Sequence, residues 1–380
     1  QRATTTTMWE RLPGGPASII VFLCILAAYT VQTESIQYIQ HTLGYQKPLF
    51  LLFVTHSSFV FLLPIYLGFI HVFTTRSTTQ CCSLLLRDIR RQLDFAFGPQ
   101  DTPRRRASTD VLRMLAILLV LTVALTVPSV SWFLAVPLTS MANITSIYNT
   151  FSLWALVFSV YFLQEPWSYL QAVAVLLGVL GVAISAYGGT TQPAIVAGLT
   201  GGKVITYALL GDALALVGAI SMAAYEIFYK RLTVIPHDES LGSFAPLPSS
   251  ADDDVTHSQQ ETEPEGELPF GLHPIAMTTG IGAITFALLW IPLVIMHATG
   301  GESLEAPKHV GTFLWIALSV VCGVLFNGCF AILLSLWGPV LASMSCLLTT
   351  VIVQLTDVAL GIPFSWIGML LSLIHISEPT

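Results

Sequence analysis

Two glutamates stand near the ends of long apolar runs in this sequence. Glu34 closes the first run and Glu226 closes the sixth. A charged carboxylate is costly in hydrocarbon, so such side chains usually face a cavity or a polar partner. There they can bind a cation or exchange a proton. The two glutamates therefore predict a polar site inside an apolar protein.

Six further polar residues lie within apolar runs: His56, Tyr148, Asn149, Asn327, Gln354 and Asp357. Their groups suit solute binding, but they also suit helix–helix hydrogen bonds, which stabilise by only about 0.6 kcal/mol on average. For each residue alone both interpretations stay open. The full set of eight favours a substrate-binding site. The sequence offers no metal-spaced histidine pair, phosphate-cradling glycine loop or nucleophile elbow, so we predict no catalytic residues, metal or cofactor.

The apolar interiors contain no lysine or arginine, since Arg113 and Lys230 stand at the ends of runs. A substrate with several phosphates needs cationic partners in low dielectric. This absence favours a neutral or cationic solute, with a carboxylate that exchanges protons. Lys230 is placed to reach one entrance, so a nucleotide sugar or sugar phosphate stays as an alternative.

The chain has 380 residues, of which 54% are hydrophobic and only 10% are charged. Apolar runs of roughly 20 residues are long enough to cross a bilayer as helices. Nine complete runs occur, and a tenth starts at residue 365. The nine are 17–36, 48–72, 114–134, 143–163, 168–187, 208–229, 274–297, 312–333 and 339–360. The predicted fold is an all-α polytopic membrane protein with ten transmembrane helices.

Lysine and arginine fall mainly on one side of this predicted topology. With the N-terminus in the cytosol, twelve of the fifteen lie on the cytosolic side, and only Lys47, Lys203 and Lys308 lie opposite. Cytosolic loops of membrane proteins carry such an excess. The asymmetry predicts a cytosolic N-terminus and supports the helix count.

A basic segment, 74–111, separates the second and third runs. Within it, Leu85, Leu86, Ile89 and Leu93 are predicted to share one helix face, and Arg87, Arg90 and Arg91 the other. The pattern fits a helix on an anionic inner leaflet, and a short helix in a solvated loop fits it equally. Three arginines, 104–106, precede Ser108 and predict a kinase site there.

A second segment, 232–272, carries nine acidic residues and no lysine or arginine, and its composition predicts disorder. It divides the chain into two five-helix halves, 17–187 and 208–370. A gap-free offset of 197 residues aligns Ser146, Leu163, Pro166 and Ser168 with Ser343, Leu360, Pro363 and Ser365. Because five is odd, the halves must enter the membrane in opposite senses. An inverted repeat is a common transporter design, with the site at the repeat interface.

Three stretches resemble the drug/metabolite transporter superfamily, in particular its EamA-type, ten-helix members. Residues 144–184 resemble that family's fourth and fifth helices, with Glu165 at the turn and Gly178 and Gly181 after it. Residues 211–232 resemble its sixth helix. Residues 33–59 are most similar to fungal relatives of solute carrier family 35, found in vacuolar or Golgi membranes. The turn glutamate is not duplicated, because Ile362 takes its place in the second half.

The resemblance implies a secondary-active transporter that moves a small organic solute by alternating access across an internal membrane, vacuolar or Golgi. It does not imply which solute. A non-transporting receptor or scaffold acting through the charged segments stays as an alternative from another class. The expected partners are a small-molecule solute and the lipid bilayer, with no nucleic acid and with a homodimer left open.

The last ten residues, 371–380, read as LSLIHISEPT, which resembles a translated sequencing adapter. We therefore expect the tenth helix to be truncated.

Overall fold

The computed structural model describes residues 13–74, 76–98, 103–139, 141–188, 202–234 and 268–359. Only the backbone is described at 103–107, 141–142, 182–188, 202–206, 350, 351 and 353–359. The first half contains α1 (Gly15–Gln37), η2 (Tyr38–Thr42), α2 (Pro48–Ser57), η3 (Ser58–Phe61), α3 (Leu62–Phe73), α4 (Thr78–Phe97), α5 (Pro103–Ala135), α6 (Met141–Tyr148), α7 (Phe151–Phe162) and α8 (Tyr169–Gly188). The second half contains α9 (Gly202–Thr233), α10 (Leu272–Leu288), α11 (Trp290–Ala298) and α12 (Val310–Ala359).

Long apolar helices dominate the described residues. Seven helical segments there are long and apolar enough to cross a membrane: Gly15–Thr42, Pro48–Phe73, Ser108–Ala135, Asn143–Phe162, Tyr207–Thr233, Leu272–Ala298 and Val310–Thr349. Tyr169–Gly181 is a shorter apolar helix. Large apolar side chains such as Ile65, Leu209 and Phe313 point outward and are about 60–67% exposed, as a lipid-facing surface requires. The chain is a multi-pass integral membrane protein.

Each of the nine predicted runs is mostly helical within the described residues, but three runs are divided: 48–72 between α2, η3 and α3, 143–163 between α6 and α7, and 274–297 between α10 and α11. The last two are joined in α12, which breaks at Gly338, where φ is 77°. A left-handed backbone suits glycine, and Pro339 follows directly. The tenth run and residues 371–380 lie outside the described residues. The count of ten helices and the inverted relation of the halves stay predictions.

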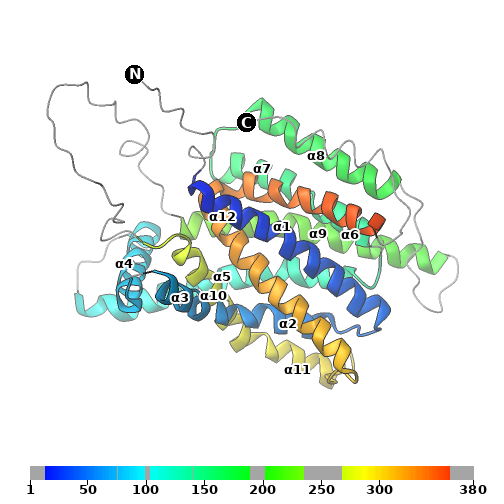
Figure 1. Cartoon of the computed structure of the whole chain (residues 1–380), viewed down its shortest axis with the longest axis horizontal. Coiled ribbons are helices and arrows are strands. Elements are labelled where there is room, and N and C mark those ends of the chain that lie inside the picture. Colours follow the sequence, from blue (N-terminus) through cyan, green and yellow to red (C-terminus); the bar gives the residue numbers. More distant parts are fainter. Residues whose placement is uncertain are drawn as a thin grey trace.

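The two halves interleave rather than pack as separate blocks. The closest helix pairs join a first-half helix to a second-half helix: α1 with α12, α5 with α9, and α7 with α9 and α12. Figure 1 shows α1 and α12 crossing the bundle together. The largest buried cluster takes Phe59 and Phe151 from the first half and Tyr229 and Phe330 from the second. The core therefore lies at the interface of the halves.

Close backbone approach fixes one of these contacts. A Cβ built on Gly282 of α10 would lie 2.7 Å from the Phe59 Cβ and 2.8 Å from the Val60 backbone nitrogen in η3. Backbone atoms cannot yield as a flexible side chain does, so only glycine fits between α10 and η3 here.

We expect Gly282→Val to be strongly destabilising, because overpacking of this kind typically costs about 1–3 kcal/mol or more. The melting temperature of the purified protein in detergent measures the effect. Gly68→Val on α3 is the matched control, since a Cβ at Gly68 meets nothing within 4 Å. Equal melting temperatures for both variants would contradict the close approach.

The predicted amphipathic helix is α4, which lies at one end of the bundle (Figure 1). It packs on the protein: Cys81, Leu85 and Leu93 are buried, while Leu86 is 57% exposed. The prediction that Leu86 shares one face with Leu85, Ile89 and Leu93 is wrong. Adjacent residues of a helix point about 100° apart, so Leu86 is exposed while Leu85 is buried.

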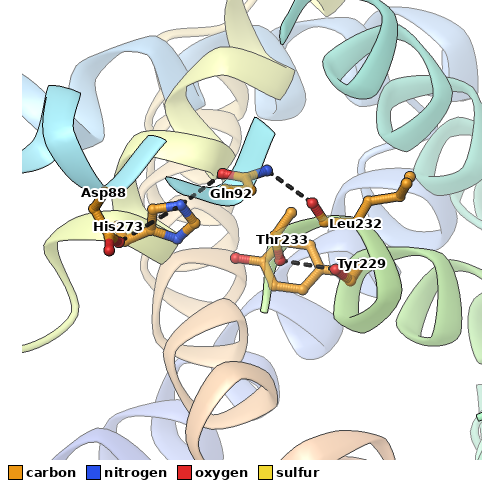
Figure 2. Close-up of polar contacts among 6 residues, drawn as sticks. All are labelled: Asp88, Gln92, Tyr229, Leu232, Thr233 and His273. Carbon is orange, nitrogen blue, oxygen red and sulfur yellow. Dashed lines mark hydrogen bonds and ion pairs between the residues drawn. The ribbon is translucent and has the colours of Figure 1, made fainter. Parts of the chain in front are cut away.

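One side chain of α4 connects two second-half helices. Gln92 donates from Nε2 to the Leu232 carbonyl at 2.8 Å, and its Oε1 lies 2.8 Å from His273 Nε2. Figure 2 shows Gln92 between these partners, with Asp88 beside His273, 4.0 Å away. The Leu232 carbonyl is among the last of α9, which have no partner within their own helix. Gln92 therefore fixes the end of α9 against the start of α10.

Candidate functional site

A cavity lies at the interface of the halves, since residues of both halves line it. It is lined by Tyr29, Gln32, Thr33, His56, Leu125, Ser129, Trp132, Phe133, Tyr148, Phe151, Met222, Phe326, Asn327 and Cys346. The cavity is open on one side, and its empty space of about 630 Å³ includes open solvent there.

The cavity wall is aromatic, with polar atoms at a few points. The polar atoms without a hydrogen-bond partner among the described residues include Thr33 Oγ1, His56 Nδ1 and Trp132 Nε1. Asn327 uses its Nδ2 to donate to the Gly323 carbonyl at 2.9 Å. Buried polar groups normally find partners. These three atoms are covered by neighbouring atoms here, so they would reach a solute or water only after a neighbouring side chain moves.

No lysine or arginine lines this cavity. Within the described residues there is also no group of three or more His, Cys, Asp or Glu side chains that could hold a metal. The wall therefore offers aromatic faces and neutral hydrogen-bonding groups.

Glu226 of α9 lies beside the cavity rather than in its wall. It is completely buried, and neither carboxylate oxygen has a hydrogen-bond partner among the described residues. Met222, one turn earlier on α9, lines the cavity. The nearest cation along α9, Lys230, pairs with Glu165 instead. A Glu226–Lys230 pair, the structural alternative to a site role, is therefore absent here.

The structure thus places three of the eight predicted site residues in the cavity wall: His56, Tyr148 and Asn327. Glu34 is half-buried on α1 and does not line the cavity, although the preceding Thr33 does. Asn149 is buried after α6 and is also absent from the wall. The backbones of Gln354 and Asp357 belong to α12, and their side chains lie outside the described residues.

One end of the bundle, opposite α4, is closed by Glu302. This residue lies after α11 and is 6% exposed. Its carboxylate accepts the backbone N–H groups of Leu49, at 3.0 Å, and Phe50, at 2.8 Å. These are early N–H groups of α2, which have no partner within the helix, and a negative charge at a helix N-terminus is stabilising.

Two further contacts reinforce this closure. Lys47 hydrogen bonds the Ser303 hydroxyl, and the Tyr45 hydroxyl donates to the Glu305 carbonyl at 2.9 Å. Burial, and then the Glu302 and Glu305 carboxylates, raise the pKa of Tyr45 above its usual range. The Tyr45 hydroxyl therefore keeps its proton as a donor. All these contacts join the halves.

The α4 end has a different closure. Lys230 at the end of α9 forms an ion pair with Glu165, in the turn after α7, and both are partly buried. The Lys230 ammonium lies against Gly338 at the break in α12: a Cβ there would be 3.0 Å from Nζ. A second cavity, lined in part by these residues and by Trp167 and Trp337, surrounds the pair.

Sequence reasoning missed several wall residues and both closures. Trp132 and Phe133 look like ordinary lipid-facing aromatics in an apolar run. Gln32 and Thr33 lie beside the chosen Glu34, and a helical wheel places them on different faces. Glu302 stands in a short polar loop, where a carboxylate needs no explanation. No signal in the sequence marks it as a cap for a helix some 250 residues earlier.

Known proteins resemble this chain over nearly its whole length in fold, but over only one segment in sequence. A solved structure described only as "Crystal structure of protein" is similar over 95% of this chain and 93% of its own, with a TM-score of 0.53 and 12% identity. That likeness concerns the fold alone. No curated protein matches the chain. Residues 94–187 match the EamA-like transporter family, so the first half of this multi-pass membrane protein contains a segment similar to that family.

Proposed function

We propose that this protein is a secondary-active transporter of a small neutral or cationic organic solute, bound in the cavity between its halves. The single observation that carries the proposal is the position of that cavity. It draws its wall from α1, α2, α5, α6 and α7 of one half and α9 and α12 of the other. Each end is closed by contacts between the halves. Alternating access needs such paired closures around a central site.

The chemistry of the wall supports the substrate class. Aromatic faces attract cations and also stack on flat neutral groups, while a solute with several phosphates would lack a cationic partner here. The buried Glu226 carboxylate needs a proton or a cation at that depth. Proton coupling through Glu226 is part of the proposal. The nucleotide-sugar alternative loses support because Lys230 is paired with Glu165.

A receptor or scaffold without transport would not need a cavity with unpaired polar atoms at the interface of the halves. That cavity is why transport is favoured. A vacuolar or Golgi location, a cytosolic N-terminus, a fungal origin and a homodimer remain parts of the proposal. So does modification of Ser108, which is exposed on α5.

Uptake into proteoliposomes, with a mixed metabolite library, tests the proposal. We expect Ser129→Phe to abolish uptake of any transported solute, because Ser129 lines the cavity and phenylalanine would fill it. Ser221→Phe is the matched control: both serines bond the carbonyl four residues earlier, at 2.8 and 2.7 Å, but Ser221 lies outside the wall. Equal uptake by the two variants, with both proteins folded, would contradict a cavity route.

A further inference from the structure

Contacts on the buried face of α4 determine which residues form its outward face. Gln92 is 1% exposed and hydrogen bonds both α9 and α10. Cys81 and Leu85 are buried in a cluster with Ile70 of α3 and Leu272 of α10. A helix held on three neighbours cannot rotate about its own axis. The residues that face outward are therefore a fixed property of the fold.

The neighbouring helix α3 sets the depth of this face. Val72 and Phe73, the last residues of α3, are 72% and 71% exposed. Apolar side chains so exposed at the end of a spanning helix belong at the border of the hydrocarbon. Helix α4 begins five residues later, at Thr78, and packs beside α3. It therefore lies at the level of the lipid head groups.

The outward face combines cations with apolar side chains. Arg87, Arg90 and Arg91 are exposed, and none makes a hydrogen bond or ion pair within the described part of the chain. Leu86 is 57% and Phe97 46% exposed beside them, and the Arg113 guanidinium lies over the Phe97 ring, 5.2 Å from its centre. Of the two acidic residues of α4, Asp88 points the other way, toward His273 (Figure 2), and Asp94, one turn after Arg90, is partly exposed.

We infer that the outward face of α4 binds anionic lipid head groups of the adjacent leaflet. The three arginines meet lipid phosphate and carboxylate groups, to which guanidinium groups bind strongly. Leu86 and Phe97 enter the boundary of the acyl chains, as the apolar residues of interfacial helices do. These apolar neighbours, and the depth of α4, favour a lipid over an acidic peptide. The inference does not depend on transport.

Binding of a soluble short-chain lipid to the full chain in detergent provides the test. Dioctanoyl phosphatidylserine is titrated while the melting temperature is followed, with dioctanoyl phosphatidylcholine as the reference lipid. We expect wild type to prefer phosphatidylserine. Replacing Arg87, Arg90 and Arg91 together with glutamine should raise the apparent Kd for phosphatidylserine about a hundredfold and leave that for phosphatidylcholine unchanged.

Replacing the same three arginines with lysine is the matched control, and it should keep most of the preference. No preference in wild type would overturn the inference. If, in addition, the glutamine variant melts lower without any added lipid, the arginines pair within the chain, and an acidic segment such as 235–267 becomes their partner instead of lipid. A preference that survives in the glutamine variant would also overturn it.

Discussion

Glu226→Gln is expected to abolish the pH dependence of uptake while leaving the protein folded. The carboxylate is buried, has no hydrogen-bond partner among the described residues, and lies one turn along α9 from Met222 of the cavity wall. If its proton is exchanged during transport, uptake by wild type should change by up to about tenfold per pH unit near its titration. Glutamine keeps the shape but binds no proton, so the profile should become flat.

Lys230→Met is the control, because it removes the cation nearest to Glu226 along α9. Lys230 lies one turn along α9, but its partner is Glu165, so its loss should alter closure of the α4 end and leave the pH profile in place. The measurement is uptake into proteoliposomes at several pH values, with melting temperatures of all three proteins. If both variants keep the wild-type profile and only reduce expression, Glu226 is structural and proton coupling through it is wrong.

Glu302→Ala is expected to open the end of the bundle opposite α4. The substitution leaves the N–H groups of Leu49 and Phe50 without their acceptor, which typically costs about 1–3 kcal/mol. If closure depends on that contact, the population of the open form rises about tenfold for each 1.4 kcal/mol lost.

Cys346 is a built-in reporter of this opening, because it lines the cavity and is 2% exposed. In a protein whose other five cysteines are replaced by serine, a membrane-impermeant maleimide is added from the Glu302 side. We expect at least about tenfold faster labelling in Glu302→Ala than in wild type. Glu305→Ala is the control, since the backbone carbonyl of that residue, not its side chain, accepts the Tyr45 bond. A lower melting temperature with unchanged labelling would make Glu302 a helix cap and no gate.

The sequence predicted helices better than contacts, and the reason is physical. Length and apolarity decide whether a segment spans a membrane, and both are local properties. All nine complete runs therefore fall on helices. Whether Tyr148 or the adjacent Asn149 faces the cavity depends on helix rotation, which distant partners set. Polar type alone could not separate the two.

The sequence could not predict that α4 packs on the protein, for a related reason. The periodicity that predicts a helix on a lipid surface is the same one that predicts a helix packed on protein. Gln92, a polar residue between apolar positions, gave no hint that it joins Leu232 to His273. Proximity in the sequence does not identify the partner of Lys230 either: Glu226 is one helical turn away, but Glu165 is the partner in space.

The bridge made by Gln92 has a consequence for how this chain can change in evolution. Leu232 and His273 are the points near which the chain leaves α9 and rejoins α10, and one side chain holds both. The spacing of these two anchors is therefore independent of what lies between them. The composition of 235–267 predicts disorder, and for a disordered connection each doubling of length costs only about 0.6 kcal/mol in closure entropy. We therefore expect insertions and deletions at 235–267 to be nearly neutral for the bundle, so that new sequence for recognition or regulation can accumulate there without disturbing the helices.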